Sequence, residues 1–352
     1  MDSLTQAALG AVVGQAVMGR RVGRVAPMFG AVLGTLPDLD VLIAFGGAVE
    51  DFVYHRGFSH SLLVHLLVTP LLAWLILRFH APSRQYKVQW AFAVLAILWT
   101  HALLDAFTVY GTQLLWPLTD YPFGISSVFI IDPFYTVPLL LGLYLAFKAG
   151  WSTEKANRTV TLALLVSTAY LGWSVIAKEW LHEKIDQALV MQSIEADAIL
   201  SVPSPFNTLL WRVIVLQEED YKVGHATLWD SPEDIDFKSY PKGEMLLKGI
   251  ESEWDVQRLA AFTKGFYRVA LREDQIVITD LRMGYEGSYV FNFSVGQAGV
   301  DGTVIAHKAM PVRDKRDVAK LALIWHRLWD KRVSLHLEDV VIEDAAPCEG
   351  LC

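Results

Sequence analysis

The stretch "HRGFSHSLLVHLLVTPLLAWLIL" at residues 55–77 changes character within a few positions. It begins with ionisable side chains (His55, Arg56, His60 and, deeper, His65) and continues as an almost unbroken apolar run. An apolar run of this length can cross a lipid bilayer as a helix. Ionisable residues in such a segment are costly and usually serve a function. The stretch therefore predicts a membrane helix that starts beside a functional group of side chains.

The chain divides into an apolar half and an ordinary soluble half. Hydrophobic residues make up 53% of the 352 residues, and the mean hydropathy is +0.34, which is more apolar than a typical soluble protein. Residues 1–177 hold only ten of the 30 Lys and Arg and nine of the 38 Asp and Glu. We expect a transmembrane domain over 1–177, a soluble domain over 178–345 and a tail over 346–352.

The net charge of −8 comes mostly from the soluble half. It argues against a basic nucleic-acid-binding surface. The apolar half makes membrane lipids the expected partners. The two cysteines, Cys348 and Cys352, lie in the tail and exclude a disulfide framework. We expect them to be unpaired, with a local bridge or a metal clip as the alternatives.

Four segments are apolar and long enough to be transmembrane helices, at residues 61–79, 89–109, 125–147 and 159–177. Two earlier segments are less regular. Residues 4–19 are rich in Ala and Gly, which permit close helix packing. Residues 25–46 are interrupted by "LPDLD", where Pro37 disfavours helical geometry at the preceding residue. We expect a helical membrane bundle of four clear helices plus one or two irregular ones.

Basic residues predict the orientation of this bundle. Nine of the ten Lys and Arg in the apolar half lie at residues 20–24, 78–87 and 148–158. Loops rich in Lys and Arg favour the cytoplasmic side. The intervening connections, and everything after residue 178, are therefore expected on the opposite side, which is the periplasm in a bacterial inner membrane.

The second half has the pattern of an α+β domain. Residues 211–217, 275–284 and 288–295 read as strands, with a turn at "YEGS" (285–288). Residues 253–262 and 317–332 read as amphipathic helices. "TDLRMG" places Asp280 near Arg282, and the two could close over a site in the first half or form a salt bridge within the domain.

The ionisable residues of the apolar half should lie at one depth on one side of the membrane. His101 and Asp105 are spaced four apart, so they share one face of a helix. The predicted topology brings the outer ends of the other segments to the same level. Mixed nitrogen and oxygen ligands suit zinc, or manganese or iron where carboxylates dominate. We therefore predict a site for one or two divalent ions, with six candidate ligands: Asp38, Asp40, His55, His60, His101 and Asp105.

Each motif taken alone also has a simpler interpretation. An H-x-x-x-D pair can be a hydrogen bond within a helix, and P-D-x-D can be a helix cap or turn. His65 is expected to be a packed core histidine, and Asp132 to cap the helix that follows Pro133. Arg56 either extends to lipid headgroups or holds a substrate phosphate through its guanidinium group. The motifs together favour a shared metal site more strongly than any one of them does.

The motifs resemble those of the YdjM-like family of inner-membrane proteins, which are described as metal-dependent hydrolases. The resemblance rests on "MDSLTQAALGA", "GTLPDLDVL", "YHRGFSHSLL" and "THALLDAFTVYGTQLLWP" within about the first 135 residues, with "SPFNTLLWRV" and "TDLRMG" in the second half. It implies a remote similarity to zinc-dependent phospholipase C and P1-type nucleases. It also implies ligand roles for His101 and Asp105, for the Asp38/Asp40 pair and for the His55/His60 pair.

One departure from the family pattern concerns the N-terminal segment. The family usually has Thr-His where this sequence has Thr5-Gln6. A glutamine carbonyl is a poor ligand for zinc, so the resemblance implies a weakened second metal position or a histidine that was never a ligand.

The sequence therefore predicts a membrane-embedded, metal-dependent hydrolase of a phosphoester or similar ester, with its site at the periplasmic face and a lipid or lipid-linked substrate. Arg56 and Asp40 are the candidate catalytic residues. Two alternatives remain open. One is an ion-handling membrane protein with a structural acid/histidine cluster, and the other is a scaffold with a vestigial metal site.

Overall fold

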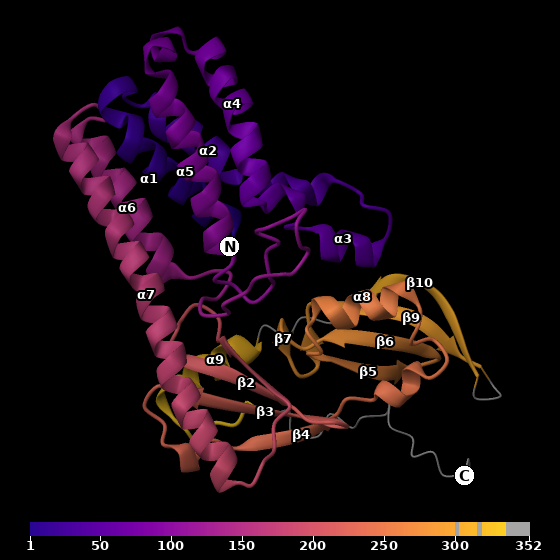
Figure 1. Ribbon diagram of the computed structural model, residues 1–352. Coiled ribbons are helices and arrows are strands. Elements are labelled where there is room, and N and C mark those ends of the chain that lie inside the picture. Colours follow the sequence, from indigo (N-terminus) through magenta and orange to yellow (C-terminus); the bar gives the residue numbers. More distant parts are fainter. Residues whose placement is uncertain (300–302, 315–318, 336–352) are drawn as a thin grey trace. The chain divides into compact units, whose positions relative to one another are not determined.

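The computed structural model describes residues 1–299, 303–314 and 319–335. Contacts between residues divide the chain into two compact units (Figure 1). The first comprises Met1–Ile43, Tyr54–Glu179 and Pro205–Thr208, and the second comprises Ala44–Val53, Trp180–Ser204 and the chain from Leu209 onward. The predicted tail with Cys348 and Cys352 lies outside the described residues.

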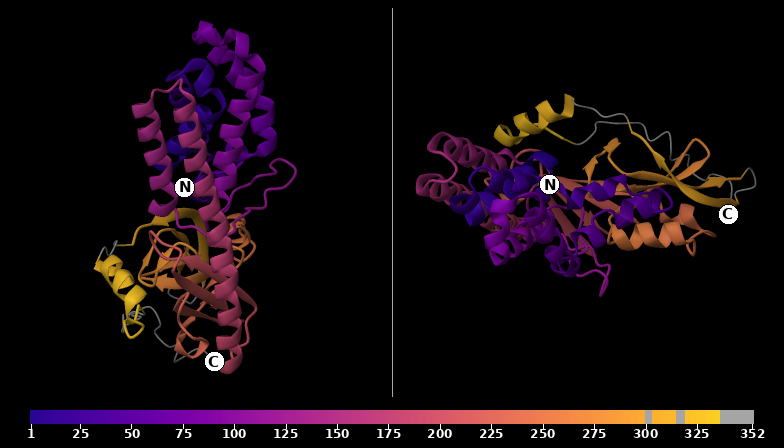
Figure 2. Two further views of the ribbon diagram at one scale, coloured as in Figure 1. Left: turned by 90° about the vertical axis from the view of Figure 1, so that its left-hand side faces the viewer. Right: turned by 90° about the horizontal axis from the view of Figure 1, so that it is seen from above.

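The first unit is a bundle of helices whose core is formed by apolar side chains such as Leu9, Trp90, Ile97 and Leu139. Figure 2 shows the bundle from two further directions. Its longer helices are α1 (Ser3–Val22), α2 (Val25–Thr35), α4 (Leu62–Phe79), α5 (Lys87–Asp105), α6 (Pro133–Ala149) and the part of α7 (Glu154–Met191) up to Glu179. Short 3₁₀ helices join them: η1 (Pro37–Leu42), η2 (Phe58–His60) and η3 (Ala81–Tyr86).

Helices α1 and α2 pack backbone against backbone through glycines. A β-carbon added at Gly10 would lie 2.2 Å from the Gly30 carbonyl oxygen, and one at Gly34 would lie 2.5 Å from the Gln6 carbonyl oxygen. Only glycine permits so close an approach. The Ala/Gly-rich segment predicted to pack tightly thus does so against the helix that leads into "LPDLD".

Among the described residues, three helical segments are long and apolar enough to cross a membrane: Leu62–Phe79, Ala81–Asp105 and Glu154–Met191. The predicted segment 125–147 differs, because its first residues are not helical and α6 begins only at Pro133. With 17 residues α6 is shorter than these spans. The fourth transmembrane helix of the sequence prediction is therefore not confirmed. The predicted segment 159–177 lies within the much longer α7.

The second unit contains two four-stranded antiparallel sheets, with strand orders β1-β2-β3-β4 and β10-β9-β6-β5. The first sheet comprises β1 (Ala198–Pro203), β2 (Leu210–Leu216), β3 (Asp220–Thr227) and β4 (Phe237–Pro241). The second comprises β5 (Tyr267–Arg272), β6 (Gln275–Asp280), β9 (Asn292–Ala298) and β10 (Val304–Val312). A small hairpin pairs β7 (Gly284–Tyr285) with β8 (Ser288–Tyr289), at the predicted turn.

Helices of the second unit are α8 (Trp254–Phe262), α9 (Ala319–Trp329), most of α3 (Ala48–Tyr54), and the 3₁₀ helices η4 (Pro232–Asp234) and η5 (Glu244–Leu247). The β-sheet-rich domain expected after the helical region is thus present. Arg282 donates to Asp280 through Nε (2.9 Å) and Nη2 (2.8 Å), so this pair forms a salt bridge inside the second unit. This is the second of the two roles considered for "TDLRMG".

Candidate metal centre

Four of the six candidate ligands converge in the first unit: Asp38, His60, His101 and Asp105. We call these four residues the quartet. Asp38 lies in η1, His60 ends η2, and the other two lie in the last turns of α5. Their ligand atoms all lie within 4.8 Å of one another. His60, His101 and Asp105 are buried, and the Asp38 side chain is 16% exposed.

The distances within the quartet fit one tetrahedral ion. His60 Nε2 lies 3.1 Å from both His101 Nε2 and Asp105 Oδ2. His101 Nε2 lies 3.6 Å from Asp105 Oδ2, and Asp38 Oδ1 lies 3.5 and 3.6 Å from the two imidazole nitrogens. Zinc bonds of 2.0–2.1 Å in a tetrahedron separate neighbouring ligand atoms by roughly 3.4 Å. These five separations are close to that value, and all four ligand atoms lie within 4.8 Å of one another, so the quartet could hold a single zinc-sized ion.

Hydrogen bonds outside the quartet place a proton on Nδ1 of both histidines, so each Nε2 is an acceptor whenever its ring is neutral. His101 Nδ1 donates to the carbonyl oxygen of Gly34 at 2.7 Å, and a carbonyl can only accept. His60 Nδ1 lies 2.9 Å from Ser59 Oγ, which donates its own hydrogen to Asp40. In the neutral imidazoles both Nε2 atoms are then acceptors. Two lone pairs and two carboxylates that face one another need a cation, either a proton or a metal ion.

Asp40 lies outside the quartet although it is only two residues from Asp38. A 3₁₀ helix turns by about 120° per residue, so η1 directs the two carboxylates to different sides. Asp40 Oδ2 accepts from the Arg56 backbone N–H (2.9 Å) and from Ser59. Burial alone would raise the pKa of Asp40, but its hydrogen bond to His55 lowers that pKa below the usual value. The Asp40 carboxylate therefore orients His55, Ser59 and the backbone at Arg56.

His55 also lies outside the quartet. Its Nδ1 is 2.8 Å from Asp40 Oδ1, and its ring packs edge-on against Tyr110 at 5.5 Å between centroids. Arg56 takes a left-handed backbone conformation (φ 61°) at the turn that the sequence suggested near Gly57. The His55 and His60 rings lie 6.3 Å apart between centroids, but His55 Nδ1 contacts Asp40 whereas His60 Nε2 points into the quartet.

Arg56 is buried and holds groups of the site itself. Its Nε lies 3.3 Å from Asp105 Oδ2, and its Nη1 donates to Thr108 Oγ1 at 3.0 Å. The guanidinium lies 5.2 Å from the centre of the Tyr110 ring. Its direct partner is thus a carboxylate of the quartet. A role in holding a substrate anion stays a prediction.

The N-terminal segment reaches the same carboxylate. Gln6 Nε2 donates to Asp105 Oδ1 at 3.0 Å, and the α-amino group of Met1 forms an ion pair with Asp105. Gln6 Oε1 is buried, and within the described part of the chain it has no hydrogen-bond partner. Gln6, where the family usually has histidine, therefore borders the quartet, with one acceptor atom unused.

The remaining candidates follow their simpler interpretations. Asp132 caps α6 by accepting from the Phe134 N–H at 2.9 Å, and it also accepts from Tyr170. His65 is buried and donates through Nε2 to the Ser59 carbonyl oxygen at 2.7 Å. The sequence reasoning missed Ser59, although its place beside His60 in "RGFSH" could have suggested a hydrogen-bonding role. It also missed Thr108 and Tyr110, for which the sequence carries no comparable signal.

The helices and the quartet together define a membrane protein with a candidate metal centre, and comparison with known proteins identifies its family. The sequence model of the YdjM inner membrane protein family matches residues 1–181. The chain belongs to this family, which together with the apolar helices supports a location in the inner membrane.

Two curated proteins match this chain. The uncharacterized protein YfhP of Bacillus subtilis is 25% identical over 236 residues, which are 64% of this chain and 68% of the relative. The inner membrane protein YbcI of Escherichia coli is 38% identical over 117 residues, 31% of this chain and 66% of the relative. The matches thus span about two thirds of each relative, and neither name states an activity. No solved structure matches the chain.

Proposed function

We propose that this protein is a membrane-embedded, metal-dependent hydrolase of a phosphoester or similar ester. The quartet is the observation that carries the proposal, because two bare imidazole nitrogens and two carboxylates face one another at tetrahedral spacing. A divalent metal, when bound, supplies Lewis acidity that activates water and polarises an ester oxygen. Zinc suits two nitrogen and two oxygen donors, and manganese or iron is the alternative.

The surrounding side chains hold the quartet in place. Ser59 and Asp40 fix the proton of His60 on Nδ1, and the Gly34 carbonyl does the same for His101. Such outer contacts set the tautomer and the orientation of metal-binding histidines. Asp40 and His55 engage each other, which favours one ion over two. In this reading Asp40 is a positioning residue, and Arg56 balances the charge of Asp105.

Orientation and substrate class belong to the same proposal. The basic loops favour a periplasmic position for the site and for the second unit. Since the site lies at the ends of membrane helices, a lipid or lipid-linked ester is the substrate class that reaches it most directly.

A second candidate is a non-catalytic scaffold or ion-handling protein. One observation favours it: Arg56 and the Met1 amine both pair with Asp105, so protein cations already balance part of the negative charge. In that case a proton would take the place of the metal between the imidazoles.

Elemental analysis of the purified protein separates the two. We expect about one equivalent of a transition metal per chain, and its loss in His60→Ala and Asp105→Ala. His80→Ala is a matched control, since His80 bonds Ser83 and not the quartet. A wild-type protein without stoichiometric metal, after incubation with zinc, would favour the second candidate. Release of phosphate or acid from lipid esters by the metal-loaded protein would then test the reaction itself.

A further inference from the structure

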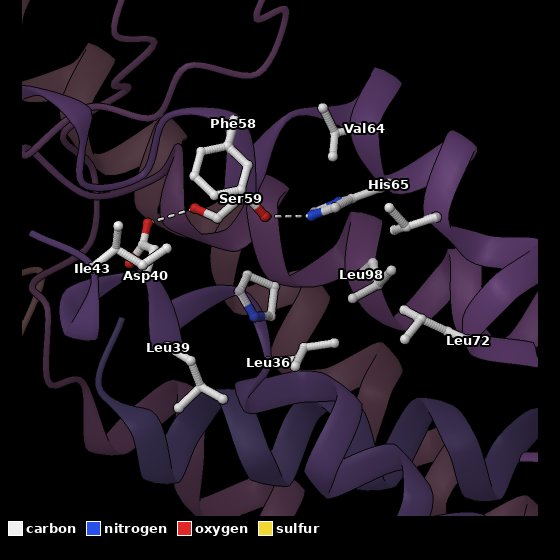
Figure 3. Close-up of a pocket in the computed structure, with 12 residues that line it drawn as sticks. Leu36, Leu39, Asp40, Ile43, Phe58, Ser59, Val64, His65, Leu72 and Leu98 are labelled. Carbon is white, nitrogen blue, oxygen red and sulfur yellow. Dashed lines mark hydrogen bonds between the residues drawn. The ribbon is translucent and has the colours of Figure 1, made fainter. Parts of the chain in front are cut away.

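A cavity of about 250 Å³ lies beside the Ser59–Asp40 contact in the first unit. Its walls come from η1, η2, α4 and α5, and they are mostly apolar (Figure 3). Leu36, Leu39 and Phe58 line it near η1 and η2, and Leu72 and Leu98 line it farther along the helices. Its polar lining residues are Asp40, Ser59 and His65.

Several lining residues of the cavity follow one membrane helix. Val64, Val68 and Leu72 are spaced four apart, so they form one stripe along about 12 Å of α4. Figure 3 shows Leu72 and Asp40 at opposite ends of the lining. The cavity thus has a polar end near the residues that orient His60 and an apolar end along a helix long enough to cross a bilayer. A lipid molecule likewise has one polar end and one apolar end.

His65 lines the cavity and carries a polar atom without a hydrogen-bond partner among the described residues. The side chain is buried, with only 2% of the residue exposed, and Nε2 donates to the Ser59 carbonyl oxygen. Nδ1 of the neutral ring is therefore an acceptor. It is buried and has no hydrogen-bond partner in the described part of the protein. A buried acceptor without a donor costs free energy, and a water molecule in so apolar a cavity would find few other partners.

We propose that the cavity binds the hydrocarbon chain of one membrane lipid whose polar end donates a hydroxyl or amide hydrogen to His65 Nδ1. The lipid's role as the substrate rests on the proposed function, whereas its binding does not. A chain that enters from the bilayer gains little from the hydrophobic effect, because it leaves an equally apolar surrounding. The hydrogen bond to His65 and the packing against Val68 and Leu72 therefore decide which lipid binds.

Photolabelling of the full-length protein in non-ionic detergent tests this inference. The probe is a long-chain primary alcohol with a diazirine near its apolar end, and labelled peptides are mapped by mass spectrometry. We expect label near Leu72 and Leu98. The unlabelled alcohol should compete roughly fivefold better than its methyl ether, which cannot donate a hydrogen bond. In His65→Phe this difference should vanish.

Matched tryptophan variants of α4 separate the cavity from the lipid-facing surface. Val68→Trp fills the cavity and should reduce labelling several-fold, while Leu67→Trp lies on an exposed face (78% exposed) and should leave it unchanged. Equal labelling around all faces of α4, or equal competition by alcohol and ether in the wild type, would overturn the proposal.

Asp105→Ala distinguishes failure of this inference from failure of the proposed function. The variant should lose metal and keep the labelling. If the wild type is labelled but binds no metal, the proposed hydrolase function is wrong and the lipid-binding cavity stands. If the wild type binds metal but is not labelled, the lipid-binding cavity is wrong and the proposed function stands.

Discussion

Both units bury charged side chains, but they balance the charge differently. In the second unit Arg212 Nη2 donates to Glu286 Oε1 at 2.5 Å, Nη1 donates to the Leu281 carbonyl oxygen, and the Tyr289 hydroxyl joins the same carboxylate. This unit supplies its own guanidinium to the buried carboxylate. The quartet also has cations of its own, since Arg56 and the Met1 amine pair with Asp105. It differs from the Arg212–Glu286 pair because two imidazole nitrogens also face each other at 3.1 Å beside the carboxylates. A carboxylate with a guanidinium alone indicates a structural role, whereas converging imidazole nitrogens and carboxylates suit an external cation.

Removal of one partner from the structural pair should have the largest effect on stability. Arg212→Ala leaves Glu286 buried without its cation, and such losses cost about 3–5 kcal/mol. We expect a lower urea midpoint, measured by tryptophan fluorescence in detergent. The double variant Arg212→Met with Glu286→Leu should recover much of the loss. If Arg212→Ala were as stable as the wild type, the Arg212–Glu286 pair would have no structural role and its contrast with the quartet would fail.

The same pair predicts an acid-sensitive stability. Burial tends to raise the pKa of Glu286, but Arg212 outweighs it and lowers the pKa from 4.5 to about 2. A depressed folded-state pKa stabilises the protein above the unfolded-state pKa, and this stabilisation is lost as the pH falls from about 5 to 2. The loss is roughly 3 kcal/mol. Urea denaturation between about pH 5 and pH 2 should show that the free energy of unfolding falls less in Glu286→Gln than in the wild type. Equal pH dependence in the two proteins would mean that Glu286 is not the group responsible.

Zinc should stabilise only the first unit, through the quartet. A ligand at a free concentration a hundredfold above its Kd adds about 2.7 kcal/mol to the free energy of unfolding. We expect thermal unfolding of wild type and His80→Ala to shift upward with zinc and downward with a chelator. His101→Ala should not respond. An equal zinc response in His101→Ala would place the ion elsewhere.

The smallest expected effect concerns Ser59. Ser59→Ala breaks the link between His60 Nδ1 and Asp40, and loss of such outer contacts weakens metal affinity by roughly tenfold or somewhat more. Competition with a zinc-binding dye measures this change. Ser59→Thr keeps the hydroxyl and should restore affinity, and Ser152→Ala on the exposed surface is the control. Unchanged affinity in Ser59→Ala would mean that this contact does not orient His60.

The sequence predicted the convergence of the metal motifs well, since helical spacing pairs His101 with Asp105 and the break at Pro37 brings Asp38 to them. The sequence could not show which of the six candidate ligands join the quartet and which lie outside it. That division depends on the 3₁₀ geometry of η1 and on the left-handed turn at Arg56, and both arise from packing beyond the local residues. The segment 125–147 shows a limit of hydropathy alone, because the capping pattern at Asp132 and Pro133 indicated the start of the helix that the apolar run placed too early.

The glycine contact between α1 and α2 has a consequence for protein engineering. Gly34, which packs against the backbone of α1, also supplies the carbonyl oxygen that fixes His101. Side chains alone would thus not reproduce this centre on another helical scaffold. A faithful transplant would have to carry the glycine-lined helix pair as well, since the position of one imidazole depends on how closely two backbones approach.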